Sequence, residues 1–357
     1  MRLTGNKGEW SELYVLLFLL STGKLFAADK DVKRIDSVFF PILKILREEQ
    51  EKRQYEYRIS SEASVEVYFN NIKKKDISRE TLVEYAAYLY ESIRSGGERA
   101  FAIDRAEEIM TELECEKIAA PSSDKTDITM QIHDVQTGYD PICGFSIKSE
   151  LGNPPTLLNA SGATNFVFEV KGLTDGQMDE INAIASKNKI LDRISKIQEY
   201  GSLSFERVDS PVFSDNLMMI DSRMEEIVAE MLLYQYMTGI MDCEAVIQAM
   251  EDSNPLRFPR KGLYEYKMKK FLCSVALGMV PSRQWNGHDE ANGGYIIVTT
   301  DGDVLAYHIY NRDFFEDYLL KNTRFERGST SRHKYASIYK KDGKMYINLN
   351  LQIRFKG

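Results

Sequence analysis

The chain has 357 residues, of which 43% are hydrophobic and 28% charged, with no low-complexity tract. This composition is typical of a globular protein with a substantial core, in one large domain or two ordinary ones, and excludes a disordered or fibrous chain. The net charge of −8 argues only weakly against nucleic acid as a partner. The cysteines are far apart and form no CxxC pair, which argues against a zinc module or a disulfide framework and fits a reducing cytosol: Cys115, Cys143, Cys243 and Cys273.

An apolar run at residues 14–20 (YVLLFLL) invites a membrane interpretation. It is too short to cross a bilayer, which needs roughly 20 apolar residues. A signal peptide would explain Lys7 before the run, but Glu9 and Glu12 in its charged segment argue against it. We therefore expect a buried helix and a cytoplasmic protein without membrane contact, with secretion as the minor alternative.

Residues 1–120 are expected to form a mainly helical N-terminal region that contributes to the core. The clearest signal is one apolar stripe at helical spacing, with Ser78 as a candidate N-cap before it and a glycine pair at residues 96–97 after it. Its members are Leu82, Tyr85, Ala86, Leu89 and Ile93. Residues 38–74 are expected to hold further helix, broken near residues 58–61.

Residues 121–210 are expected to form a core hairpin of two strands and a helix, and to carry the candidate functional residues. Residues 126–132 and 144–152 read as two paired strands with a turn near residues 139–141. Alternate side chains of a strand face opposite sides, so one face of the second strand suits a core and the other carries a hydroxyl, an ammonium and a carboxylate. The apolar face holds Phe145, Ile147 and Ser149, and the polar face Ser146, Lys148 and Glu150. A capping box at residues 174–177 should then open a helix that runs toward Glu199.

Residues 211–357 are expected to be helical over about 222–250 and 262–279, and then β-rich. Asp-Gly pairs at residues 301–302 and 342–343 predict two hairpins. After the second pair, residues 345–353 alternate between apolar and polar side chains and predict a strand with one dry face. Residues 321–357 hold ten Lys or Arg against two acids, a local charge of +8 on a body of −16. Such a segment attracts phosphate, although a solvated pair of strands accounts for it equally well.

The acid and the lysine of the hairpin suggest metal-dependent phosphodiester cleavage. Mg²⁺ prefers carboxylate and water oxygens, and Asp127 supplies one carboxylate. A lysine beside the attacking water can orient it and hold developing negative charge, a role that fits Lys148. The arrangement resembles the PD-(D/E)xK nuclease fold, except that Ser146 stands where the second acid is usual. For the missing metal ligand we favour Glu12, with Glu150 a close second; Glu9 and Glu169 are weaker candidates.

Longer blocks of sequence resemble the HpaII family of type II restriction endonucleases. They lie at residues 6–14, 144–161, 164–166, 322–323, 329–335 and 346–355, from the start of the chain to its end. The resemblance implies an α/β (α+β) restriction-endonuclease-like fold with a mixed sheet core. It also implies Mg²⁺-dependent double-strand cleavage of DNA at a short palindrome, with CCGG as the family's type specificity. A homodimer would match a palindrome, and a companion DNA methyltransferase would protect the same sites in a restriction-modification system.

The C-terminal blocks contain side chains suited to DNA. Small hydroxyl residues alternate with cations in a segment whose composition favours contacts to phosphates and guanine edges. The residues concerned are Arg327, Ser331, Arg332, His333 and Lys334. The polar face of the last strand (Asn348, Asn350, Gln352 and Arg354) is a second candidate for reading bases, although plain solvation explains it at least as well.

Two other functions compete with this interpretation. A ββα-metal nuclease would need a catalytic histidine, for which His308 with Asn311 and His288 with Asp289 are the candidates, but no zinc-binding cysteines are nearby. A catalytically inactive DNA-binding protein of the same fold would explain Ser146. Lys148 argues against it, because DNA binding alone does not require that amine.

Overall fold

A computed structural model describes residues 3–49, 53–120, 125–135, 137–308 and 312–356 of the chain. The chain forms two compact units, and each is assembled from segments distant in sequence. The first unit comprises Met1–Pro155 and Glu290–Phe315, and the second comprises Thr156–Asp289 and Glu316–Lys356. These units do not coincide with the three regions expected from the sequence. The mixed α/β class is confirmed, since helices and sheets are both substantial.

The first unit is built on a nine-stranded mixed sheet. Its order is β1-β12-β11-β7-β6-β2-β3-β4-β5, and β1 also pairs with β2, so the first six strands close on themselves. The pairs β1–β12 and β7–β11 are parallel, and the others are antiparallel. The strands are β1 (Lys24–Ala28), β2 (Arg34–Glu48), β3 (Gln54–Arg58), β4 (Ser64–Phe69), β5 (Ile72–Ser78), β6 (Ile128–Ile132), β7 (Ile142–Ser149), β11 (Gly294–Val298) and β12 (Val304–His308).

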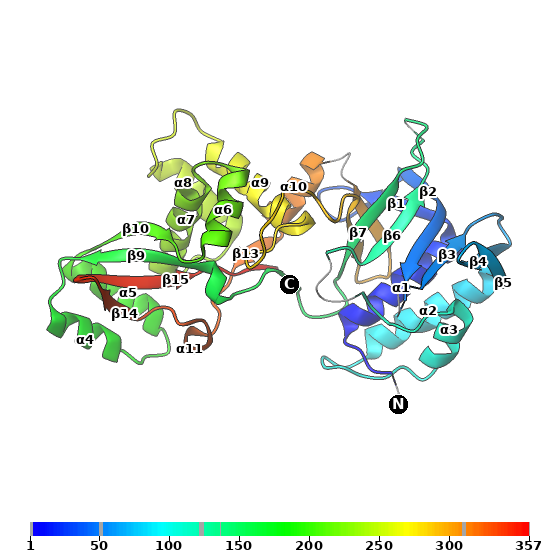
Figure 1. The fold of residues 1–357 in the computed structure, drawn as a ribbon, viewed down its shortest axis with the longest axis horizontal. Helices are drawn as coiled ribbons and strands as arrows, with labels where there is room; N and C mark the ends of the chain where they lie inside the picture. Colours follow the sequence, from blue (N-terminus) through cyan, green and yellow to red (C-terminus); the bar gives the residue numbers. More distant parts are fainter. Residues whose placement is uncertain (1–2, 50–52, 121–124, 136, 309–311, 357) are drawn as a thin grey trace. The chain divides into compact units, whose positions relative to one another are not determined.

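Three helices lie on one side of this sheet: α1 (Lys7–Thr22), α2 (Arg79–Ser95) and α3 (Ala106–Leu113) (Figure 1). The apolar run at residues 14–20 lies within α1 and is almost entirely buried, as predicted. The stripe predicted for α2 is its buried face, and Ser78 caps the helix by accepting a hydrogen bond from the backbone of Thr81. None of the helices among the described residues has the length and apolar character needed to cross a membrane.

The helix predicted over residues 38–74 is wrong, because this segment forms most of β2 and all of β3 and β4. Its apolar side chains alternate with polar ones: Tyr55, Tyr57, Val65 and Val67 are buried, and their neighbours are more exposed. The connection between β4 and β5 is Asn70-Asn71, with φ of 48° and 64°. Two asparagines in the left-handed region are typical of a two-residue hairpin, and this was the signal that the prediction missed.

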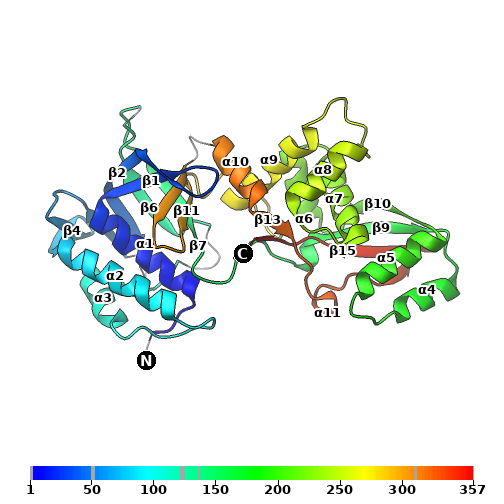
Figure 2. The same cartoon turned by 180° about the vertical axis from the view of Figure 1, so that it is seen from behind.

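The second unit has a four-stranded antiparallel sheet and a three-stranded one. The larger sheet has the order β10 (Ser202–Val208), β9 (Asn165–Lys171), β15 (Lys344–Asn350) and β14 (Ile338–Lys341), and the smaller one β13 (Thr323–Phe325), β16 (Ile353–Phe355) and β8 (Thr156–Leu158). Helices α6 (Pro211–Ile220), α7 (Met224–Thr238), α8 (Cys243–Ser253) and α9 (Leu263–Leu277) pack together beside the larger sheet (Figure 2). The remaining helices are α4 (Asp175–Ala183), α5 (Lys189–Tyr200), α10 (Arg312–Lys321), the single turn α11 (Thr330–His333) and the 3₁₀ turn Gly162–Thr164.

Both long helices predicted for this unit are interrupted. The capping box at Thr174 opens α4 as predicted, but that helix ends at Ala183, and α5 follows it. The helix predicted over 222–250 divides into α7 and α8 at Gly239, which has a φ of 81°. Asp242 then caps α8. A glycine in the left-handed region followed by a new capping residue ends one helix and starts another.

The hairpins at residues 301–302 and 342–343 are confirmed as β11–β12 and β14–β15. The strand predicted over 345–353 is interrupted at residues 351–352, and its two parts join different sheets. Leu351 donates its backbone N–H to Thr164 rather than to a neighbouring strand. All four cysteines are buried thiols.

Candidate active site

The hairpin of β6 and β7 brings the predicted acid and lysine together. In this pairing Ile128 lies opposite Phe145, so Asp127, immediately before β6, comes beside Ser146. Asp127 Oδ2 accepts hydrogen bonds from Ser146 Oγ at 3.0 Å and from the backbone N–H of Ile147 at 2.6 Å. Lys148 Nζ donates to Ser146 Oγ at 2.8 Å. Carboxylate, hydroxyl and ammonium therefore form one hydrogen-bonded chain along the strand.

The amine of Lys148 lies in a sheltered place. The side chain is half-buried, and its ammonium stands 5.1 Å from the centre of the Tyr295 ring on β11. Burial lowers the pKa of Lys148, and the nearby charges of Asp127 and Glu12 only partly offset that effect. An amine whose pKa is lowered by burial beside carboxylates is a common feature of catalytic sites.

Helix α1 brings Glu12 to the same place. Asn6 and Glu9 form a capping box that fixes the start of the helix, so the Glu9 carboxylate bonds the backbone N–H of Asn6. One turn later, the buried Ser11 bonds Ser149 Oγ at 2.8 Å and ties α1 to the end of β7. Glu12 follows directly and projects toward the hairpin. This leaves Glu12 rather than Glu9 as the acid that α1 offers to the site.

The environment of Glu12 strongly disfavours its charge. Burial and the charge of Asp127 raise the pKa of Glu12 to about 8, against the opposing effects of the Ala120 backbone, Arg47 and Lys148. The backbone N–H of Ala120 donates to Glu12 Oε2 at 2.7 Å. A buried carboxylate whose pKa is raised by the charge of a second carboxylate marks a site that a divalent cation would stabilise.

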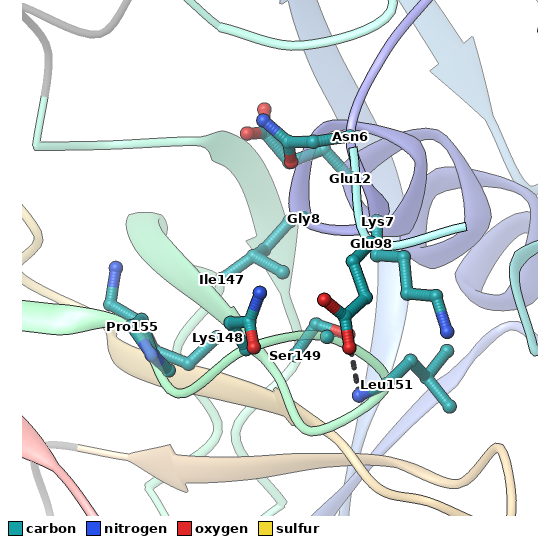
Figure 3. Close-up of a pocket in the computed structure, with 12 residues that line it drawn as sticks. Asn6, Lys7, Gly8, Glu12, Glu98, Ile147, Lys148, Ser149, Leu151 and Pro155 are labelled. Carbon is teal, nitrogen blue, oxygen red and sulfur yellow. Dashed lines mark hydrogen bonds between the residues drawn. The ribbon is translucent and has the colours of Figure 1, made fainter. Parts of the chain in front are cut away.

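Glu12 and Lys148 line a pocket of about 580 Å³, and Asp127 lies behind its wall, bonded to the backbone of the lining residue Ile147 (Figure 3). The walls come from α1 and its cap, from the segment after α2, from the end of β7, and from the loop that follows β7: Asn6, Lys7, Gly8, Glu12, Glu98, Ile147, Lys148, Ser149, Leu151, Gly152, Asn153 and Pro155. No group of three or more His, Cys, Asp or Glu side chains suited to a metal occurs among the described residues. A cation here would therefore rely on two carboxylates, backbone oxygen and water, which is the ligand set that Mg²⁺ accepts.

Glu150 and Glu169 do not reach this pocket. Strand β7 ends at Ser149 and the chain bends at Glu150, so the alternation that would place Glu150 beside Lys148 no longer applies. Glu150 instead lines another hollow, with Asp301 and Asp303 among its neighbours. Glu169 lies on β9 of the second unit and pairs with Lys171 at 3.2 Å and Lys344 at 3.1 Å. Of the acids considered for the missing metal ligand, Glu12 therefore lines the pocket beside Lys148, whereas Glu150 and Glu169 do not.

A glycine that the sequence did not single out allows the hairpin to close. A Cβ on Gly144 would lie 2.7 Å from Thr126 Cγ2 and 2.9 Å from Thr126 Oγ1. Thr126 in turn donates its hydroxyl to the backbone of Glu290 at 3.0 Å, and Gly144 N–H donates to Asn292 Oδ1 at 2.8 Å. Residue 126 precedes Asp127, so this close approach fixes the strand that carries the carboxylate. In the strand register Gly144 pairs with Thr129, so strand pairing alone did not signal its close approach to Thr126.

The residues expected to contact DNA belong to the second unit. Ser331, Arg332 and Lys334 are exposed at or just after α11, whereas His333 is half-buried. Arg327 is less available, because its guanidinium donates to the Gln235 backbone at 3.1 Å and lies over the ring of Tyr236.

Of the polar strand face considered for reading bases, Asn350 is fully buried, so neither base reading nor plain solvation accounts for it. Its side chain bonds the Ser161 backbone and the Asn165 side chain, both at 2.7 Å, so residues 161–165 cover this end of the face. Two pairs were considered for a ββα-metal site, His308 with Asn311 and His288 with Asp289. Asn311 lies outside the described residues. Trp285 Nε1 donates to the backbone of His288 at 2.9 Å.

Comparison with known proteins identifies relatives over nearly the whole length. The family model described as HpaII restriction endonuclease matches residues 6–355. The type II restriction enzyme HpaII of Haemophilus parainfluenzae is 41% identical over 357 residues, covering 99% of this chain and 98% of that enzyme. No solved structure matches the chain.

Proposed function

The chain belongs to the HpaII restriction endonuclease family and is a type II site-specific nuclease, and from that premise we propose that it makes Mg²⁺-dependent double-strand cuts at a short palindrome, CCGG. The observation that carries the proposed chemistry is the hydrogen-bonded chain of Asp127, Ser146 and Lys148, with Glu12 meeting it from α1.

The chemistry of the donor set fits Mg²⁺. Asp127 and Glu12 supply carboxylate oxygens, and the raised pKa of Glu12 indicates a place where negative charge lacks a compensating cation. We assign these two residues as metal ligands. When bound, Mg²⁺ supplies charge neutralisation at the phosphate and favours the ionised form of water.

The protein's own groups supply positioning. Lys148 is assigned the role of holding the attacking water and the negative charge that develops on the phosphate. Ser146 accepts from Lys148 Nζ and donates to Asp127 Oδ2, so it holds the amine and the carboxylate in register. On this assignment Ser146 replaces the usual second acid as a positioning group, and Glu12 replaces it as a ligand.

Duplex DNA is the proposed substrate, with the exposed residues around α11 as contacts. Arg332 and Lys334 form no ion pair with any other residue that the structure describes, which leaves both cations available to phosphate. A palindromic target favours a homodimer. A companion methyltransferase acting on the same sequence would protect the host, and the free, buried cysteines suit a reducing cytoplasm.

The test is digestion of a plasmid of known sequence in Mg²⁺ and in Ca²⁺, followed by sequencing of the DNA ends. We expect discrete fragments ending within CCGG in Mg²⁺ and binding without cutting in Ca²⁺. Asp140→Asn is a matched control for Asp127→Asn, because Asp140 lies in the same hairpin and its carboxylate pairs with the exposed His133 side chain, at 2.7 Å, rather than with the site. Binding without cleavage in Mg²⁺ would instead favour the inactive DNA-binding protein.

A further inference from the structure

The exposed cations at α11 lie on a loop that several hydrogen bonds hold in place. We call residues 329–336 the basic loop. Asn165 on β9 donates its side-chain N–H to the backbone of His333 at 3.1 Å. The buried Tyr335 donates its hydroxyl to the backbone of Gly328 at 2.7 Å, and Ala336 N–H donates to the backbone of Asn348 at 2.8 Å. Hydrogen bonds to β9, to β15 and to Gly328, the residue just before the loop, therefore hold the basic loop in place.

The backbone of the basic loop is strained at two places. Lys334 and Ala336 have φ of 52° and 64°, in the left-handed region that side chains other than glycine seldom adopt. Ala336 is fully buried, so water cannot satisfy its backbone groups. Such conformations persist where surrounding contacts impose them, and they concentrate at sites that bind ligands.

Arg193 on α5 imposes the second of these conformations. Its Nη1 donates to the backbone oxygen of Ala336 at 2.6 Å and to Ser337 Oγ at 2.9 Å. Its Nη2 donates to the backbone oxygens of Asn182 at 2.6 Å and Ile184 at 3.0 Å. One planar guanidinium therefore joins the end of α4 and the connection that follows it to the end of the basic loop.

Arg193 is also a buried cation without a carboxylate partner among the described residues. Only 9% of its surface is exposed, and all four of its hydrogen bonds go to neutral oxygens. Burial lowers the pKa of its guanidinium. An uncompensated buried charge is costly for folding alone, but it adds to the positive potential of a loop whose outer side carries Arg332 and Lys334.

We propose that Arg193 is a positioning residue for target recognition, which holds the basic loop in its strained shape and so sets the geometry with which Arg332 and Lys334 meet the phosphates and guanine edges of the DNA. This inference rests on the proposed function, because it takes the basic loop to contact duplex DNA.

The test compares Arg193→Met with Lys196→Met in the full-length protein. Lys196 is on the same helix and carries the same charge, but it bonds Glu199 and Tyr200 rather than the basic loop. Affinities for a CCGG duplex and a scrambled duplex of equal length are measured in Ca²⁺, and kcat and KM in Mg²⁺. We expect Arg193→Met to lower the ratio of the two affinities and to raise KM by about tenfold or more, with kcat nearly unchanged, and Lys196→Met to match the unaltered protein.

A lower kcat with unchanged KM and unchanged discrimination would overturn the proposal, because a purely structural residue changes the folded fraction and not the quality of binding. Should Arg193→Met fail to fold, Arg193→Lys retains the charge but cannot span the same oxygens, and it should still reduce discrimination. Full discrimination in Arg193→Lys would overturn the proposal as well. If the unaltered protein does not discriminate between the duplexes, or if Arg332→Ala with Lys334→Ala leaves affinity intact, the proposed function or its DNA-contact assignment fails instead.

Discussion

Replacing Glu12 with glutamine should stabilise the metal-free protein at alkaline pH and abolish its response to Mg²⁺. Glutamine keeps the oxygen that accepts from the Ala120 backbone, so the local fold has no reason to change. What it removes is a charge that burial and Asp127 disfavour.

The size of the effect follows from the pKa of Glu12. A shift from 4.5 to about 8 corresponds to about 5 kcal/mol by which the folded protein disfavours the ionised carboxylate. The side chain is only half-buried and retains some solvent screening, so we expect a gain of about 1–3 kcal/mol. Between the unfolded and folded pKa values the folded state binds the extra proton, so the stability of the unaltered protein falls as pH rises from 4.5 to about 8. Glutamine does not titrate, so its advantage should grow over that interval and then level off.

The assay is urea unfolding in EDTA at pH 5 and pH 9, repeated with Mg²⁺. Glu98→Gln is the matched control, because Glu98 lines the same pocket but is exposed. In EDTA at pH 9, Glu12→Gln should be more stable than the unaltered protein; with Mg²⁺ the order should reverse, and cleavage should be lost. Glu150→Gln should cost less activity than Glu12→Gln. A destabilised Glu12→Gln at pH 9, or one that Mg²⁺ still stabilises, would refute the reasoning.

Further predictions concern the hairpin itself. Asp127→Ala and Lys148→Ala should abolish cleavage while duplex affinity in Ca²⁺, measured by fluorescence anisotropy, stays largely intact; retained cutting would remove either residue from the site. Ser146→Ala should be milder and reduce the single-turnover rate by about 10–100-fold, since it removes a hydroxyl that orients the carboxylate and the amine but removes neither charge. Gly144→Ala should lower the free energy of unfolding by about 1–3 kcal/mol, because its Cβ overlaps Thr126 and the strand that carries Asp127 must shift. An unchanged free energy of unfolding in Gly144→Ala would show that the hairpin accommodates the Cβ without a shift of Thr126.

The sequence predicted the hairpin because its signals are local. An acid beside the first strand, alternation along the second and a turn between them suffice to bring Asp127 near Lys148. Helix α1 was also predicted, from its apolar run. The meeting of Glu12 with the hairpin, by contrast, depends on the Ser11–Ser149 contact between segments more than a hundred residues apart. No local pattern encodes that contact.

The errors of the sequence analysis have separate physical causes. Alternation over β3 and β4 was missed because aromatic and β-branched residues there are interspersed with charges that also suit an exposed helix face. Glu150 was assigned by extending a strand alternation past Ser149, where β7 ends. Asn350 is still part of β15, and it is buried because residues 161–165, distant in sequence, cover that end of the strand. Arg193 gave no signal, since a lone arginine on a helix looks exposed until the loop that it supports is folded against it.

Titration of Mn²⁺ followed by electron paramagnetic resonance tests directly whether Asp127 and Glu12 hold a divalent cation beside Lys148. We expect the unaltered protein and Asp140→Asn both to take up Mn²⁺ at this site, either in the absence of DNA or with the duplex bound, and we expect Asp127→Asn and Glu12→Gln to lose that uptake. Full Mn²⁺ uptake by either of the last two variants would contradict this assignment.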